Sequence, residues 1–209
     1  MDLVADRNEL YGTSEYWDAR YKSEGPNASF DWFKTYAQIR DILLDVIPSR
    51  SSKILILGCG NSSLSEDMYL DGFEDITNVD YSSVVISAMM KRHHDKKMKW
   101  LEMDVRDLQF EDHSFDVVID KGTMDSMMTA KGSVWDPPPQ VVADCTKEVD
   151  EITRSFFGLT CGVFIYITFG QPHFRRRYLS REGWDLEIRE LGETFHYYSY
   201  IMRPIKASE

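Results

Sequence analysis

The sequence predicts an α/β fold in which a seven-stranded, mostly parallel sheet is covered by helices on both faces. Short runs of β-branched and other apolar residues alternate along the chain with helical patterns, as in consecutive strand–helix units. The run Ile-Leu-Ile-Leu at residues 54–57 contains no polar residue, which is typical of a parallel strand buried on both faces. The last two strands are too close in sequence for a helical crossover, so we expect them to pair antiparallel.

Two helices are predicted before this sheet begins. Residues 15–21 suit a short aromatic helix with Ser14 as its N-cap, and residues 32–47 suit a longer helix whose apolar residues fall on one face. No linker divides the chain, so we expect one domain that spans all 209 residues. Within it, about residues 1–50 would form an N-terminal helical lid and residues 51–209 the sheet core.

Strands and helices then alternate to the end of the chain. The strands are predicted at residues 53–57, 76–80, 100–104, 115–120, 163–169, 184–191 and 195–202. The helices between them are predicted at residues 64–70, 82–91 and 141–157. A tight turn at Gly192 and Glu193 joins the final two strands.

Composition and charge narrow the classes to which this protein can belong. Of its 209 residues, 43% are hydrophobic and 13% aromatic, which is enough to build the core of a globular domain. Asp and Glu number 35 against 24 Lys and Arg, for a net charge of −11. Because nucleic acids are polyanions, this excess argues against a nucleic-acid binder, whereas it suits a basic protein partner. An acidic surface that serves only solubility is equally consistent with it.

Membrane, secreted and metal-binding classes are also disfavoured. The longest apolar run, residues 161–169, is too short for a bilayer span of about 20 residues. Residues 1–11 lack the apolar stretch of a secretory signal. The three cysteines form no CxxC pair, so we expect neither a disulfide framework nor a metal site, and a reducing, cytoplasmic location.

The strongest site motif is the glycine turn that follows the first predicted strand. Gly58 and Gly60 lack Cβ atoms, so the backbone can turn sharply and a ligand can lie against it. Asp80 ends the next strand, roughly 20 residues beyond the turn, where a carboxylate can accept both hydroxyls of a ribose. Taken alone, each feature is also consistent with an ordinary strand–helix turn and a solvated Asp.

Two further strand ends complete a pocket for adenosine. Asp104 ends the third strand and can accept from the exocyclic amine of adenine, while the backbone of Val105 meets the edge of the ring. The fourth strand ends at residues 120–122, which supply the opposite wall. A nicotinamide dinucleotide would need a third glycine where Ser63 stands, and the chain has no Gly-Lys-Ser/Thr phosphate loop. S-adenosylmethionine, which carries no phosphate, fits better.

Several motifs together resemble one methyltransferase family. The glycine turn, Asp80, Asp104 and the antiparallel last strand resemble the Rossmann-like, seven-strand class I S-adenosylmethionine methyltransferases, although Ser62 replaces the third glycine of their usual GxGxG. Further motifs narrow the resemblance to the lysine methyltransferases of translation elongation factor 1-alpha, over about residues 14–202. These motifs are EYWDARY (15–21), FDWF (30–33), GCGNS (58–62), VDYSSV (79–84), DKGTMD (120–125) and PHFR (172–175).

This resemblance implies a set of cofactor-binding residues. Gly60 joins the set because it belongs to the glycine turn. The implied residues are Trp17, Tyr21, Trp32, Gly58, Asp80, Tyr81, Asp104, Val105 and Lys121. Trp17, Tyr21 and Trp32 lie in the predicted lid helices, where their rings can shield the sulfonium and attract it by cation–π contact. Packing of these helices on the core is the alternative for the same rings. Lys121 either pairs with the methionine carboxylate or contributes only its backbone.

These features predict an S-adenosylmethionine-dependent protein-lysine N-methyltransferase acting on elongation factor 1-alpha. We expect a monomer that needs neither a nucleic acid nor a membrane. A small-molecule methyltransferase on the same scaffold and a cofactor-binding module without catalysis are the alternatives, because a fold does not determine the acceptor. No residue is assigned as catalytic. Asp125, His173 and Tyr197, by their position near strand ends, are candidates for helping the acceptor lysine lose its proton, and a substrate-shaping or structural role is the alternative for each. Residues 175–177 are interpreted as a solvated arginine face.

Overall fold

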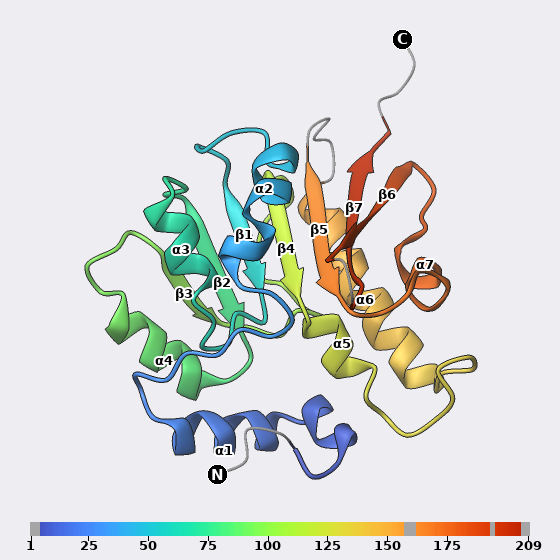
Figure 1. Cartoon of the computed structure of the whole chain (residues 1–209), viewed down its shortest axis with the longest axis horizontal. Helices are drawn as coiled ribbons and strands as arrows, with labels where there is room; N and C mark the ends of the chain where they lie inside the picture. The colour runs from blue at the N-terminus through green and yellow to red at the C-terminus, as the bar shows by residue number, and fades with distance from the viewer. Residues whose placement is uncertain (1–4, 157–161, 193–194, 206–209) are drawn as a thin grey trace.

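A single seven-stranded sheet organises the computed structural model, which describes residues 5–156, 162–192 and 195–205. The strand order is β3-β2-β1-β4-β5-β7-β6 (Figure 1). The strands are β1 Ile54–Leu57, β2 Ile76–Asp80, β3 Lys99–Glu102, β4 Val117–Lys121, β5 Val163–Thr168, β6 Trp184–Leu191 and β7 Tyr197–Pro204. Neighbours from β3 to β5 pair parallel, whereas β7 pairs antiparallel with both β5 and β6. The predicted α/β class and antiparallel last strand are confirmed.

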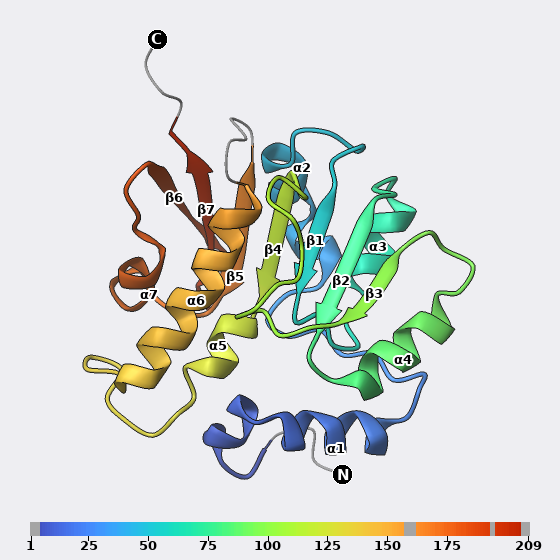
Figure 2. The same ribbon diagram turned by 180° about the vertical axis from the view of Figure 1, so that it is seen from behind.

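Helices cover both faces of the sheet. They are α2 Tyr36–Val46, α3 Leu64–Leu70, α4 Ser83–Arg92, α5 Thr123–Met127, α6 Pro139–Ser155 and α7 Pro172–Leu179. The core on one face includes α2, α3 and α4, and the core on the other includes α6 and α7 (Figures 1 and 2). In β1, Ile54 and Ile56 point into the first core, and Leu55 and Leu57 into the second. Burial on both sides explains why this run has no polar residue.

The N-terminal segment lies across an end of the sheet. A 3-10 helix, η1 Asn8–Gly12, and helix α1 Ser14–Glu24 lie below the carboxyl ends of the parallel strands (Figure 1). Helix α2 instead packs on the first face of the sheet with α3. Of the lid expected over about residues 1–50, the part at the sheet edge is therefore η1, α1 and the loop up to Phe33.

Helix α2 begins later than predicted. Trp32 and Phe33 lie in the preceding loop, where Phe33 has a φ of 64°. Thr35 is the N-cap, and its backbone N–H donates to Oε1 of Gln38 at 3.0 Å in a capping box. The prediction followed the apolar spacing through Trp32 and overlooked this capping signal.

Other differences concern element ends and short elements. Helix α1 has Thr13 as its N-cap rather than Ser14, and the predicted strands agree with the observed ones within two residues at each end. The short elements η1, α5 and α7 were not predicted. The predicted end of α6 at Phe157 and the turn residue Glu193 lie outside the described residues. None of the helices in the described ranges is both long enough and apolar enough to cross a bilayer.

Gly58 determines how the chain leaves β1. Its φ is +50°, and a Cβ added there would lie 2.1 Å from Oγ1 of Thr123. The Thr123 hydroxyl donates to the carbonyl of Leu57 at 3.0 Å, so the first turn of α5 packs directly on this bend. Only glycine fits this position without displacing α5.

We expect Gly58→Ala to lower the free energy of unfolding by about 2 to 4 kcal/mol, because it adds a steric clash to the strain of a positive φ. Gly72→Ala is the matched control. Gly72 has a φ of +97° and nothing within 4 Å of an added Cβ. Gly72→Ala should therefore lose only the about 1 to 2 kcal/mol that backbone strain costs, with no steric clash. Urea denaturation followed by circular dichroism measures both losses. Thr123→Ala should recover part of the Gly58→Ala loss, and equal losses in the two glycine variants would contradict the packing argument.

Candidate cofactor-binding site

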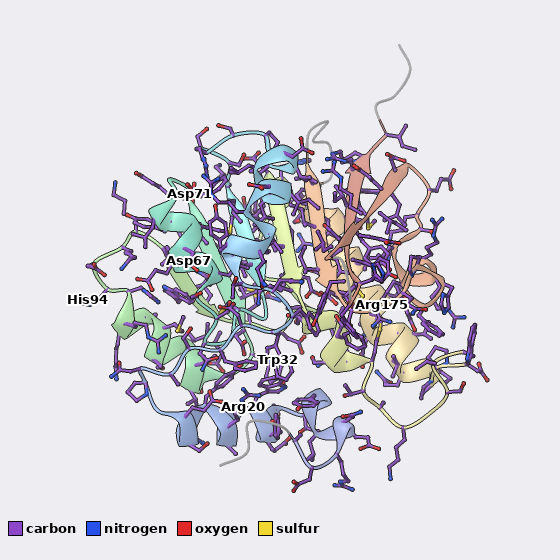
Figure 3. The ribbon with its side chains drawn as sticks, viewed as in Figure 1. Arg20, Trp32, Asp67, Asp71, His94 and Arg175 are labelled. Atoms are coloured by element: carbon purple, nitrogen blue, oxygen red, sulfur yellow. The ribbon has the colours of Figure 1, made fainter. Side chains whose placement is uncertain are left out.

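A cavity of about 290 Å³ lies at the carboxyl edge of the sheet, between the ends of β1, β2 and β4 and the N-terminal lid. Figure 3 shows Trp32 and Arg20 in the region between α1 and this edge. The structure brings eight of the ten predicted residues to the cavity wall. They are Trp17, Tyr21, Trp32, Gly58, Gly60, Asp80, Tyr81 and Lys121.

Asp80 is the buried carboxylate of this cavity. Its Oδ2 accepts a hydrogen bond from the Gly60 N–H at 3.0 Å, and its Oδ1 accepts one from the Ser82 N–H at 2.9 Å. These bonds tie the glycine turn to the start of α4 and fix the orientation of the carboxylate. Each oxygen keeps a lone pair, so the group can still accept the two hydroxyls of a ribose.

The burial of Asp80 has an energetic cost. Burial raises its pKa to about 6, and the bonds from Ser82 and Gly60 offset only part of the shift. Between about pH 4 and pH 6 the folded state therefore holds the proton more tightly than the unfolded state, and stability falls as the pH rises. Above that window the ionised group costs about 3 kcal/mol. A carboxylate retained at such a cost in a cavity is typical of a functional site.

Aromatic rings close the cavity from the N-terminal side. Trp17 stacks on Tyr21 with 5.7 Å between ring centroids and meets Trp32 edge to face at 6.1 Å. Trp32 does so from a loop and not from a helix, contrary to the prediction. A Cβ on Gly60 would lie 2.9 Å from the Tyr21 hydroxyl oxygen. The second glycine of the turn therefore makes room for the lid as well as for a ligand.

A buried arginine on α1 links these rings to the glycine turn. The guanidinium of Arg20 lies 5.0–5.5 Å from the ring centroids of Trp17, Phe30 and Trp32. Its Nε donates to Glu24 at 2.7 Å, and Glu24 also accepts from Nδ2 of Asn61 at 2.8 Å. Asn61 belongs to the glycine turn, so the lid helix is bonded to the wall that it covers.

Lys121 does not present a free ammonium to the cavity. Its Nζ pairs with Asp31 at 3.1 Å and donates to the Trp32 carbonyl at 3.0 Å. Asp31 also accepts from the hydroxyls of Ser62 and Ser63. Burial lowers the pKa of Lys121, and the Asp31 carboxylate acts in the opposite direction. The side chain thus fastens the lid loop to the end of β4, and pairing with a methionine carboxylate would require Asp31 to release it.

Asp104 and Val105 are the two predicted residues that do not line the cavity. The Asp104 carboxylate accepts from Nε of Arg106 at 3.0 Å and from its Nη2 at 2.6 Å, and Val105 is buried in the second core. Tyr81 does line the cavity, and its hydroxyl donates to the carbonyl of Thr13 at 3.4 Å. The adenine contact of Asp104 stays a prediction.

An ion pair that sequence reasoning missed lies beside the cavity. Asp125 lines the wall and accepts from Nη2 of Arg175 at 2.7 Å, from the Tyr166 hydroxyl at 2.7 Å and from the Thr168 hydroxyl at 2.6 Å. Arg175, labelled in Figure 3, is only 8% exposed, so the interpretation of this arginine as part of a solvated face is wrong. Neighbouring arginines gave no signal that one of them turns inward.

The other two candidates for taking the proton of the acceptor lysine lie away from this cavity. His173 on α7 stacks on Trp135 with 5.3 Å between ring centroids. Tyr197 packs against Phe33, and the ammonium of Lys34 lies 4.6 Å from the centre of its ring. Neither side chain is among the residues that line the cavity.

Comparison with known proteins identifies relatives along nearly the whole chain. Residues 55–147 match the model of a methyltransferase domain. The chain is 38% identical to EEF1A lysine methyltransferase 4 of Bos taurus over 203 residues, which cover 96% of this chain and 78% of the relative. The Mus musculus protein of the same name is 38% identical over 207 residues, with 98% and 80% covered. The human eEF1A lysine and N-terminal methyltransferase is 32% identical over 199 residues, but the chain spans only 27% of that protein.

Solved structures share the fold. A protein from echinomycin biosynthesis that converts a disulfide into a thioacetal group has a TM-score of 0.68 at 18% identity, with 94% of both chains covered. A SAM-dependent methyltransferase from Methanosarcina mazei has a TM-score of 0.58 at 15% identity, with 85% of this chain and 100% of that chain covered. At these identities the likeness concerns the fold alone. Together with the close sequence relatives, it shows that the chain belongs to the class I S-adenosylmethionine-dependent methyltransferases, in the family of EEF1A lysine methyltransferase 4.

Proposed function

We propose that this protein transfers a methyl group from S-adenosylmethionine to a lysine of translation elongation factor 1-alpha. The observation that carries the proposal is the 38% identity, over almost the whole chain, to proteins named as lysine methyltransferases of that factor. The excess of 35 acidic over 24 basic residues supports a basic protein substrate. The aromatic lining of the cavity supports a cofactor that carries a positive sulfur.

The eight predicted residues that line the cavity are proposed to hold the cofactor. When bound, S-adenosylmethionine supplies a methyl group on a sulfonium, an electrophile that needs no covalent enzyme intermediate. Asp80 accepts the ribose hydroxyls, and Gly58 and Gly60 let the ligand lie against bare backbone. The faces of Trp17 and Trp32 favour the sulfonium charge.

The chain contributes alignment and exclusion of water to the reaction. The acceptor lysine arrives as an ammonium and first loses one proton to water. The freed amine would then take the methyl group that the bound sulfonium supplies, with the neutral thioether as the leaving group. A closed aromatic lid keeps water from the reacting atoms and holds them in line, which is the main source of acceleration for such a displacement.

We further propose that the lid and the sheet act as one domain of a monomeric, cytoplasmic enzyme that needs neither a nucleic acid nor a membrane. Lid and sheet residues line the same cavity, which supports the single domain. The acidic balance supports a protein that binds no nucleic acid, and the lack of any CxxC pair supports a cytoplasmic location.

The lid can protect the reaction only while it stays on the sheet. Several polar links hold it there, among them the Glu24–Asn61 hydrogen bond, the Lys121–Asp31 ion pair and a hydrogen bond from Ser82 to Asp18. Both ends of the ion pair are nearly buried, so removal of one partner leaves the other charge without compensation. We therefore expect loss of either partner of this pair to loosen the lid.

The function is tested by incubating the purified protein with elongation factor 1-alpha and methyl-labelled S-adenosylmethionine. We expect label on a lysine of the factor, located by mass spectrometry, and a loss of at least tenfold for Asp80→Ala at low cofactor concentration. Asp41→Asn, an exposed change on α2, is the control and should retain full activity. Label in small molecules alone would support the small-molecule enzyme, and tight cofactor binding without any transfer would support the binding module.

The affinity for the cofactor should depend on the ionisation of Asp80. The carboxylate can accept from both ribose hydroxyls, whereas its protonated form loses an acceptor site. Because the pKa of Asp80 is about 6, we expect Kd to rise as the pH falls from 7 to 5, toward tenfold per unit at the acid end. Isothermal titration calorimetry measures this change. Asp80→Asn should bind more weakly at pH 7 by about 1 to 3 kcal/mol and show no such slope. A flat wild-type profile would show that Asp80 is not the ribose acceptor.

Loss of Asp31 should loosen the lid. In Asp31→Asn the buried Lys121 ammonium loses its partner, so we expect amide exchange in α1 to accelerate about 100-fold, the equivalent of about 3 kcal/mol. Hydrogen–deuterium exchange measured by mass spectrometry reports this opening. The double variant Asp31→Leu with Lys121→Met removes both charges and should restore most of the protection. Unchanged exchange in Asp31→Asn would mean that the pair does not hold the lid.

A further inference from the structure

A second cavity, of about 660 Å³, adjoins the first. Its walls come from the loop between α5 and α6, from the start of α7 and from the region where β7 begins. The loop lies at the lower right of Figure 1, with α7 above it on the same side, and both appear on the left of Figure 2. Four residues line both cavities, so the two spaces meet at a junction formed by Asn8, Asp125, Thr129 and Phe169.

The second cavity suits an aliphatic side chain. Most of its wall is apolar or aromatic, and includes Met128, Val134, Val141, Phe174 and Phe195. The one guanidinium in the wall, that of Arg175, is already paired with Asp125 at 2.7 Å. An anionic acceptor would therefore find no unpaired arginine or lysine in this wall, whereas an alkyl chain could bury its methylenes along it.

The junction can receive an amine at the end of that side chain. The aromatic face of Phe169 attracts a cation or the polarised N–H groups of an amine. The side chains of Asn8 and Thr129 offer oxygen acceptors at the same place. Asp125 adds a negative group that three donors hold rigidly.

Exposed apolar side chains gather around the mouth of this second cavity. We name as the apolar rim Val134, Trp135, Phe169 and Phe195, which are 60%, 68%, 48% and 62% exposed. The other five large, exposed hydrophobic side chains of the described residues lie singly on α3, α4, β3, α6 and the residue after β7. Trp135 is held in place by stacking on His173 and by edge-to-face contact with Phe174 at 4.8 Å. An ordered apolar patch that surrounds a cavity is typical of a protein-binding surface.

We propose that the second cavity is the acceptor site, into which a lysine side chain of a folded protein substrate enters from the apolar rim. The aliphatic stem lies along the apolar wall, and the amine reaches the junction with the cofactor cavity. The residues that flank the lysine dock on the rim. This inference rests on the proposed function, because it assumes a protein-lysine acceptor.

Filling the second cavity tests this route. Ala130 lines it and is exposed, so Ala130→Trp adds bulk to the mouth without disturbing the core. We expect kcat/KM toward elongation factor 1-alpha to fall at least tenfold, while the Kd of S-adenosylmethionine stays within twofold of the wild type. Thermal melting verifies that the variant is folded.

The rim is tested separately by truncation. Trp135→Ala and Phe195→Ala should each raise KM for elongation factor 1-alpha about five- to tenfold, with kcat and cofactor affinity little changed. Leu70→Ala and Met90→Ala are matched controls on α3 and α4, since both residues are as exposed as the rim and neither lines a cavity. They should leave KM unchanged.

The outcomes separate this inference from the proposed function. A wild-type protein that binds S-adenosylmethionine but does not methylate elongation factor 1-alpha would refute the proposed function. With an active wild type, unchanged kinetics in Ala130→Trp, Trp135→Ala and Phe195→Ala would refute the acceptor site alone. A rise in KM that the Leu70→Ala and Met90→Ala controls share would also refute it.

Discussion

The carboxylate of Asp80 is the group on which the rest of the site depends. Its two oxygens accept from the backbone of Gly60 and Ser82, so one buried side chain positions both the turn after β1 and the start of α4. The lid packs on that turn, since a Cβ on Gly60 would lie 2.9 Å from the Tyr21 hydroxyl oxygen. A change at Asp80 would therefore alter the ligand contacts and the seat of the lid together.

The lid is attached to the sheet through polar links on either side of its aromatic rings. Glu24 holds Asn61 in the glycine turn, and Asp31 holds Lys121 at the end of β4. The unusual Ser62 belongs to the same arrangement, since its hydroxyl donates to Asp31. A glycine there would allow a closer approach of the backbone to a ligand, but it would remove one of the donors that keep Asp31 in place. With Ser62 in place of glycine, a ligand can approach the backbone less closely, but the lid gains a hydrogen bond that keeps Asp31 in place.

The sheet and the glycine turn could be predicted because their signals are local. Each strand is an apolar run, and Asp80 stands at a fixed spacing from the turn. Trp32 was misplaced in a helix because apolar spacing continues through it, although a capping box closes the helix beyond it. Asp104 ends up beside Arg106, a partner two residues away that a strand-end argument ignores. Arg175 could not be placed at all, since its partner Asp125 is distant in sequence and only the tertiary fold brings them together.

The junction of the two cavities also bears on how the acceptor loses its proton. The Oδ1 of Asp125 already accepts from Thr168 and Arg175, and its Oδ2 accepts from Tyr166, so three donors hold the carboxylate in one orientation. Asp125 is thus suited to orient an amine that reaches the junction. The lysine ammonium would then lose its proton to water at the open side of the second cavity, before the amine reaches the junction. Selectivity for lysine would come from the length and apolar lining of the second cavity.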